Sequence, residues 1–330
     1  MITRVLSLLS SLMIACYLIT AGAADLQAQD TPSPALLVGE KSGDLLAIVD
    51  PETLEIVARV PANRQPHEIT SDGRYAYVSN SGMDFITVID LETQEQVEPI
   101  DMRPLSPIHG LWVSQGKLYF ANEDSRTISS YNPDTGEIEW VLGTGEWMSH
   151  MLMVSEDANK IFATSMFPGS ALILERVDHR RMWDISVIPT GPRAEGLDVS
   201  PDGREFWVTN VHESTISIID VEAREEIEKI DLPTNFSNRL KFTPDGRYVV
   251  VAELQGDEVL ILDARTREQV KRIDVGGGTE GIQMDPDGSR FFISVSPENK
   301  VAVIDLETLE VTGEIHGFDN PDGLWWQVGE

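Results

Sequence analysis

Residues 66–106 read PHEITSDGRYAYVSNSGMDFITVIDLETQEQVEPIDMRPLS, and this stretch decides the fold class. Aromatic and β-branched residues alternate with polar ones over residues 74–80 and recur over residues 85–90. Such a pattern is typical of short β-strands, and a Ser-Asp-Gly turn at residues 71–73 introduces the first of them. The stretch therefore predicts four strands, which lie near Ile69, over 74–80, over 85–90 and near Val97.

The same unit recurs along the rest of the chain. A Pro-Asp-Gly turn stands before further copies of the second strand at Pro201, Pro244 and Pro286. The residue that marks the start of the first strand falls at positions 67, 109, 150, 195, 238, 280 and 322, with spacings of 42, 41, 45, 43, 42 and 42 residues. A four-stranded repeat of about 40–45 residues is the signature of a propeller blade.

Two copies of the second strand carry a family resemblance. Tyr77-Val78-Ser79-Asn80 and Phe206-Trp207-Val208-Thr209-Asn210 each follow an Asp-Gly turn and precede a strand that ends in Ile-Asp. With these motifs the chain resembles the YVTN β-propeller repeat proteins over nearly all of residues 35–330, although Trp207 replaces the Tyr of the motif and Ser79 its Thr. The resemblance implies a propeller of repeated blades. It implies no particular ligand, because members of that family differ widely in what they bind.

The two ends of the chain are incomplete in opposite ways. Residues 35–65 supply three strands and lack the innermost one, whereas residues 322–327 form an inner strand with nothing after it. Pairing of the two ends completes a seventh blade and leaves no open sheet edge. We therefore expect an all-β fold, a monomeric seven-bladed β-propeller of four-stranded antiparallel blades, as a single domain over residues 35–330.

The start of the chain predicts export. A short basic segment precedes an apolar run over residues 5–20, and Ala21-Gly22-Ala23 resembles a cleavage site, so residues 1–23 are expected to be a signal peptide. The alternatives are an uncleaved membrane anchor and a lipid anchor at Cys16. Cleavage removes the only cysteine, leaves residues 24–34 as a flexible lead-in, and predicts a periplasmic or secreted protein with no membrane span.

Charge limits the choice of partners. The chain has 55 acidic and 25 basic residues, a formal net charge of −30, so it repels phosphate backbones and nucleic-acid binding is not expected. One locally basic segment over residues 175–183 interrupts the fourth unit of the repeat. We expect it to be an extended outer hairpin; the alternative is a protein-docking surface anchored by Arg180, Arg181 and Trp183.

The marker positions are the place to look for chemistry. Every inner strand of a propeller starts on the same face beside the channel, so the seven markers are expected to form one ring around its mouth. All seven are polar, and three of the six histidines of the chain occupy successive units. Neutral imidazoles bind zinc and copper, and carboxylates can complete the coordination shell. We therefore expect a zinc or copper site with these ligands: His67, His109, His150, Glu195 and Glu280.

Other interpretations of this ring stay open. It could bind a small molecule or a polypeptide without metal, or it could be only a polar channel lining. Further candidates for ligand binding on the same face are Asn80, Asn122, Asn210, His212, Asn238 and Asp322. The three asparagines that end second strands are also explained by strand-end capping, and His212 by exposure in a loop.

Catalysis has less support in the sequence. No Gly-x-Ser-x-Gly elbow, phosphate-binding loop or His-Glu-x-x-His motif occurs in it. The enzyme alternative is a metal-assisted hydrolase or lyase, in which Glu195 and Glu280 act as acid and base beside a metal-bound water.

Overall fold

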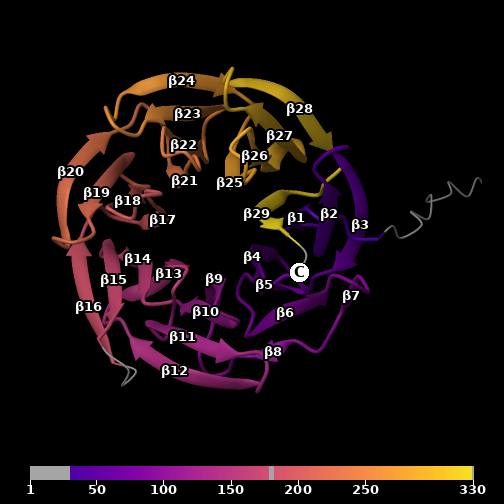
Figure 1. Cartoon of the computed structure of the whole chain (residues 1–330), viewed down its shortest axis with the longest axis horizontal. Coiled ribbons are helices and arrows are strands. Elements are labelled where there is room, and N and C mark those ends of the chain that lie inside the picture. Colours follow the sequence, from indigo (N-terminus) through magenta and orange to yellow (C-terminus); the bar gives the residue numbers. More distant parts are fainter. Residues whose placement is uncertain (1–29, 178–181, 329–330) are drawn as a thin grey trace, which may run out of the picture.

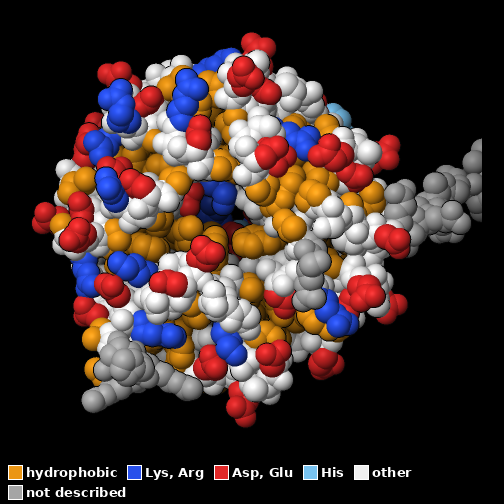
Figure 2. All heavy atoms as spheres, viewed as in Figure 1, with side chains coloured by type: hydrophobic (Ala, Val, Ile, Leu, Met, Phe, Trp, Pro, Cys, Tyr) orange, Lys and Arg blue, Asp and Glu red, His pale blue; other side chains and the backbone are white. Residues whose placement is uncertain are grey.

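The computed structural model describes residues 30–177 and 182–328. Seven antiparallel sheets of four strands, one of which has a short fifth strand, stand in a ring (Figure 1). The centre of the ring is hollowed into a channel (Figure 2). In each sheet the first strand borders the channel and the last lies at the circumference. The prediction of a seven-bladed β-propeller is confirmed.

The blades are numbered in the order in which the chain builds them. Blade 1 contains β29 (Pro321–Gln327), β1 (Ala35–Glu40), β2 (Leu45–Asp50) and β3 (Glu55–Pro61). Blade 2 contains β4 (Pro66–Ser71), β5 (Tyr75–Asn80), β6 (Phe85–Asp90), β7 (Glu95–Gln96) and β8 (Ile100–Asp101). Blade 3 contains β9 (Ile108–Ser114), β10 (Lys117–Asn122), β11 (Thr127–Asn132) and β12 (Glu137–Gly143). Blade 4 contains β13 (Trp147–Val154), β14 (Lys160–Phe167), β15 (Ser170–Arg176) and β16 (Trp183–Pro189).

The remaining blades have the same plan. Blade 5 contains β17 (Ala194–Val199), β18 (Glu205–Asn210), β19 (Thr215–Asp220) and β20 (Glu225–Asp231). Blade 6 contains β21 (Ser237–Phe242), β22 (Tyr248–Glu253), β23 (Glu258–Asp263) and β24 (Gln269–Asp274). Blade 7 contains β25 (Thr279–Met284), β26 (Arg290–Val295), β27 (Lys300–Asp305) and β28 (Glu310–His316), with the 3-10 turn η1 (Ser296–Glu298) between β26 and β27. Within the described ranges, no helix has the length and apolar character needed to cross a bilayer.

Both chain ends contribute to blade 1, as predicted. Strand β29 pairs antiparallel with β1, and Leu37 lies opposite Trp325. The single outer strand predicted near Val97 is instead divided into β7 and β8, which pair separately with β6. Pro99 lies between the two pieces and has no N–H to donate, which accounts for the interruption.

Aspartates at the ends of the third strands explain why the repeat is so regular. Asp90 Oδ1 accepts hydrogen bonds from the backbone N–H groups of Glu92 (2.9 Å) and Thr93 (3.1 Å), which forms the turn into the outer strand. The same pair of contacts recurs at Asp50, Asp220, Asp263 and Asp305. The repeated aspartate is therefore a turn signal rather than a site residue.

The hydrophobic core lies between adjacent blades. Trp207 of β18 is fully buried and packs edge-on against Phe242 of blade 6, with ring centroids 5.2 Å apart. Phe162 of β14 makes the matching contact with Phe206 of blade 5, also at 5.2 Å. Such contacts hold the inner strands side by side and thereby fix the geometry of the channel.

Some predicted features lie outside the described residues. These are the signal peptide over residues 1–23 with Cys16, the first part of the lead-in, and the basic residues Arg180 and Arg181. Trp183, the third residue of the alternative docking surface, belongs to β16. It packs against Trp140 of blade 3 at 5.3 Å, and the guanidinium of Arg176 lies 5.2 Å from its ring.

Candidate functional site

Each inner strand carries a β-bulge at its marker position. In blade 2, Pro66 and Ile69 pair with Asn80 and Val78, so the segment of β4 between them contains one residue more than its partner strand. The same excess occurs near the start of the six other inner strands. Because a bulge redirects side chains, the marker and the residue after it can both reach the channel.

The bulges bring the three marker histidines into contact. The rings of His67 (β4) and His109 (β9) have centroids 4.4 Å apart, and those of His109 and His150 (β13) are 3.6 Å apart at an interplanar angle of 30°. The three side chains therefore form one stack at the channel mouth, although more than forty residues separate each pair in the sequence. The expected gathering of successive-blade histidines is what the structure shows.

Two of these histidines and one glutamate have the geometry of a ligand group. One ligand atom each from His67, Glu68 and His109 can be chosen so that all three lie within 4.8 Å of one another. Ligands about 2.1 Å from a tetrahedral ion are about 3.4 Å apart, so small side-chain rotations would close the group. The Nδ1 atom of His109 is buried and has no hydrogen-bond partner among the described residues. We call these three residues the His67–Glu68–His109 group.

The protonation of the stack follows from its surroundings. Burial opposes protonation of His67, but the carboxylates of Asp322 (3.7 Å from Nε2) and Glu68 (3.2 Å from Nδ1) outweigh it and raise the pKa of His67. Burial, together with the neighbouring His150 and His67 rings, holds the pKa of His109 well below its usual value. His109 is thus a neutral imidazole at pH 7, and this is the form that binds metals.

His150 is part of the stack but has its own partner. Its Nδ1 lies 2.7 Å from Oε1 of Glu123, which follows the end of β10. This contact fixes the orientation of the ring against His109. Its Nδ1 is therefore already engaged, and His150 is not a member of the His67–Glu68–His109 group.

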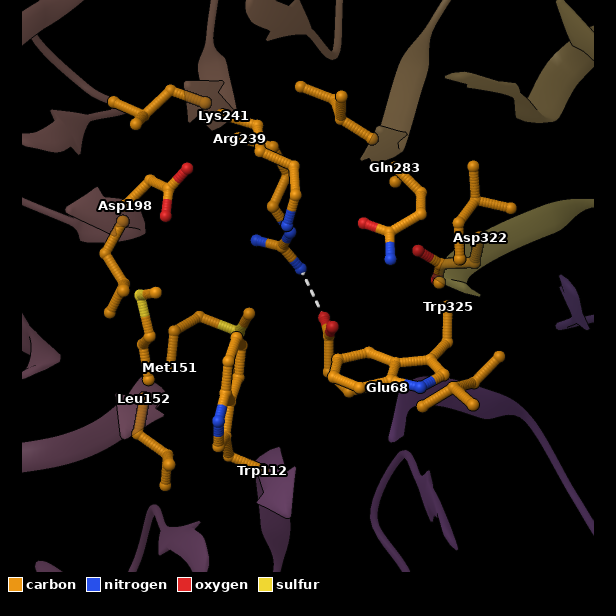
Figure 3. Close-up of a pocket in the computed structure, with 18 residues that line it drawn as sticks. Glu68, Trp112, Met151, Leu152, Asp198, Arg239, Lys241, Gln283, Asp322 and Trp325 are labelled. Atoms are coloured by element: carbon orange, nitrogen blue, oxygen red, sulfur yellow. Dashed lines mark hydrogen bonds and ion pairs between the residues drawn. The ribbon is translucent and has the colours of Figure 1, made fainter. Parts of the chain in front are cut away.

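An arginine that the sequence analysis did not select spans the channel. Arg239 of β21 contacts Oε1 of Glu68 at 2.6 Å (Figure 3). It also contacts Oε1 of Glu195 at 3.0 Å, and so joins blade 6 to blades 2 and 5. Burial disfavours ionisation of Glu68, but the guanidinium overcomes this effect and lowers the pKa of Glu68 far below its ordinary range. Arg239 directly follows the marker Asn238, so the sequence analysis would have selected it if it had also considered the residue after each marker.

Apart from Glu68, Met151 and Arg239, the residues that directly follow the seven markers are glycines. A Cβ atom at Gly323 would lie 1.9 Å from the carbonyl oxygen of His67, and one at Gly281 would lie 2.3 Å from that of Asp322. Gly196 and Gly110 face the next blade in the same way, at 2.4 and 2.8 Å. At these glycines the neighbouring inner strands approach each other too closely to leave room for a side chain. At the equivalent positions of blades 2 and 6, the side chains of Glu68 and Arg239 meet in the channel instead.

The two other predicted metal ligands have different partners. Glu195 is held by Arg193 (3.0 Å) and Arg239 (3.0 Å), and Oε2 of Glu280 accepts a hydrogen bond from Nδ2 of Asn238 at 3.3 Å. Burial and the charge of Asp322 raise the pKa of Glu280 to about 7. Both glutamates therefore lie beside the His67–Glu68–His109 group and outside it.

The remaining candidates differ in their surroundings. Asp322 pairs with Lys41 at 2.7 Å, and Oδ1 of Asn238 is buried with no partner among the described residues. His212 is exposed.

The three strand-end asparagines are buried, and each binds threonine or serine groups of its own blade: Asn80 contacts Thr87, Asn122 contacts Thr127 and Ser129, and Asn210 contacts Thr215 and Ser217. Their amides thus join the second and third strands, as capping predicts.

The fold and this mouth define a seven-bladed β-propeller with a channel closed by charged residues and a histidine stack. The model of the YNCE-like beta-propeller family matches residues 2–328, and the chain belongs to that family. No curated protein sequence gives a significant match.

Two solved structures show the same fold at low sequence identity. A functionally unknown protein from Desulfotomaculum acetoxidans is 13% identical, with a TM-score of 0.75 over 90% of this chain and 100% of that one. A hydrazine synthase chain from Kuenenia stuttgartiensis is 19% identical, with a TM-score of 0.73 over 87% of this chain and 98% of that one. At these identities the likeness establishes the fold alone.

Proposed function

We propose that this protein is an exported metal-binding β-propeller whose centre takes zinc or copper through His67, His109 and Glu68. The observation that carries the proposal is the buried Nδ1 of His109, which has no hydrogen-bond partner among the described residues and belongs to a side chain grouped with a second histidine and a glutamate. A neutral imidazole held in this way is costly to leave unpaired and well suited to a borderline metal.

The surroundings of the group support this assignment. A histidine that binds metal usually donates its other ring N–H to a carboxylate, and Asp322 lies 3.7 Å from Nε2 of His67. Arg239 holds the Glu68 carboxylate in its ionised form. Three protein ligands would leave a fourth position for water or substrate, so the hydrolase or lyase alternative rests on this same centre.

Metal content measured on protein without a histidine tag is the direct test. After removal of metal with a chelator and dialysis against zinc or copper, we expect about one equivalent per chain by mass spectrometry. The His109→Ala variant should bind at least about 100-fold more weakly, because it loses a direct ligand. The His316→Ala variant is the matched control, because its side chain is 63% exposed on the outer strand β28.

Two results would overturn the proposal. One is an unmetallated parent after incubation with either ion. The other is a His109→Ala protein with the parent's far-UV circular dichroism spectrum and the parent's metal affinity. In either case the ring would be a polar lining or a site for a metal-free ligand.

Export is the second part of the proposal and rests on residues 1–23, which have the pattern of a signal peptide. We expect protein recovered from outside the cytoplasm to begin at Ala24. N-terminal sequencing checks this. An intact N-terminus on cytoplasmic protein would contradict it.

A further inference from the structure

A cavity borders Arg239 and extends further along the inner strands. Its volume is about 90 Å³. Its lining includes five residues that each lie three positions after a marker of their inner strand: Trp112, Asp198, Lys241, Gln283 and Trp325. Figure 3 shows these side chains around one hollow, with Arg239 and Glu68 at its border. We call it the tryptophan chamber.

Two hydrogen-bonding groups of the chamber make no hydrogen bond to a described residue. The side chain of Gln283 is 8% exposed, its amide points into the hollow in Figure 3, and it makes no hydrogen bond to any described residue. The ammonium group of Lys241 makes no hydrogen bond within the described part of the chain, and its charge acts on the buried carboxylate of Asp198, whose pKa burial raises and Lys241 lowers. The amide of Gln283 is not sealed from solvent, so it is available to a ligand that enters the hollow.

The carboxylates near the chamber are already paired. Glu68 is bound by Arg239, and Asp322 by Lys41. Asp198 accepts the backbone N–H groups of Val199 at 3.0 Å and Phe242 at 2.8 Å. The hydrogen-bond donors of the chamber that make no hydrogen bond to a described residue are the Lys241 ammonium and the Gln283 amide N–H groups, and a ligand that carries a carboxylate is complementary to them.

The rest of the wall is apolar and flat. The rings of Trp112 and Trp325 meet edge to face, with centroids 5.5 Å apart at 88°, and both are only partly buried. Met151 and Met153 complete this side. In the view of Figure 2, hydrophobic side chains border the central hollow of the ring, and acidic and basic ones lie deeper. Aromatic faces and thioether sulfurs favour contact with a planar, unsaturated group.

We propose that the tryptophan chamber binds a small planar carboxylate, with its ring against Trp112 and Trp325 and its carboxylate on Lys241 and Gln283. The volume sets the size limit, because pockets for drug-sized ligands usually measure about 300–1,000 Å³. The residues proposed to hold the carboxylate differ from the three proposed metal ligands, although Glu68 borders both sites.

Benzoate is the probe for this site. We expect isothermal titration calorimetry of the full chain, with chelator present, to show binding of benzoate. Binding should be at least about tenfold weaker for benzyl alcohol, which lacks the charge, for acetate, which lacks the ring, and for benzyltrimethylammonium, which has the opposite charge. Lys241→Met and Gln283→Leu should each weaken benzoate binding at least about tenfold.

The control is Lys271→Met, which removes a lysine from the outer strand β24, far from the lining residues. It should bind benzoate as the parent does. The proposal is overturned if benzoate gives no heat, if the ammonium probe binds more tightly, or if folded Lys241→Met and Gln283→Leu proteins both keep the parent's affinity. Because metal is absent throughout, failure here leaves the metal proposal untouched.

Discussion

Glu280 offers a quantitative test of the electrostatics of the channel. Its carboxyl group is buried beside the charge of Asp322, and both effects raise its pKa from 4.5 to about 7. In the folded state Glu280 therefore holds its proton up to about pH 7, whereas the unfolded chain releases it near pH 4.5. Between these values unfolding releases a proton, so the residue makes the folded state less stable as pH rises.

Replacing Glu280 with glutamine removes this effect, because glutamine resembles the protonated form. Each pKa unit corresponds to about 1.36 kcal/mol, so a shift of about 2.5 units is worth about 3 kcal/mol. The Glu280→Gln variant should thus match the parent near pH 4.5 and exceed its free energy of unfolding by about 3 kcal/mol at pH 8. Glutamine can still accept the hydrogen bond from Asn238.

Urea denaturation followed by circular dichroism, at pH values from 4.5 to 8 with chelator present, measures this difference. Glu268→Gln is the control, because Glu268 is an exposed glutamate in the turn before β24. It should show no comparable rise with pH. A stability difference for Glu280→Gln that stays flat from pH 4.5 to 8, or that favours the parent at pH 8, would refute the reasoning.

Three further predictions concern the architecture of the channel, and urea denaturation measures each of them. Arg239→Met should lower the free energy of unfolding by about 3–5 kcal/mol, because Glu68 loses its guanidinium partner and Glu195 keeps only Arg193, and a loss below 1 kcal/mol would contradict the bridging role. Gly323→Ala should cost about 1–3 kcal/mol or more, since its Cβ would lie 1.9 Å from the His67 carbonyl, whereas Gly143→Ala, with nothing within 4 Å, should cost far less. Trp207→Ala should cost about 3–5 kcal/mol as a cavity between blades, and a near-neutral effect would be inconsistent with its complete burial.

The fold could be predicted from sequence because its signals are local and repeated. The turn before each second strand and the aspartate after each third strand recur at nearly constant spacing, and each has a hydrogen-bonding reason in the structure, as Asp90 shows. The one clear departure, the divided outer strand of blade 2, depends on a single residue, Pro99. Strand order then follows from ring closure, which needs only that the two chain ends complement each other.

The site was predictable only in part, because side-chain direction depends on bulges that no repeat spacing reveals. The markers identified His67 and His109, since an alignment of equivalent positions is enough to bring them together. Glu68 and Arg239 lie one residue further along and reach the channel only through the bulged start of each inner strand. Regular alternation would have turned them away from the side that the markers face. Glu195 was correctly placed near the mouth, but its pairing with Arg239 depends on that unanticipated arginine.

The contact between Glu68 and Arg239 gives the two proposed sites a common boundary. Both residues line the tryptophan chamber, and Glu68 is also a member of the ligand group. A metal ion and the guanidinium compete for the same carboxylate, and an anion in the chamber would compete with Glu68 for the guanidinium. If both ligands bind, an anion that draws Arg239 away from Glu68 makes that carboxylate more available to metal, and metal at Glu68 makes Arg239 more available to the anion. Since linkage is reciprocal, each ligand would raise the affinity for the other by the same factor. The ion pair between Glu68 and Arg239 would therefore couple the two proposed sites.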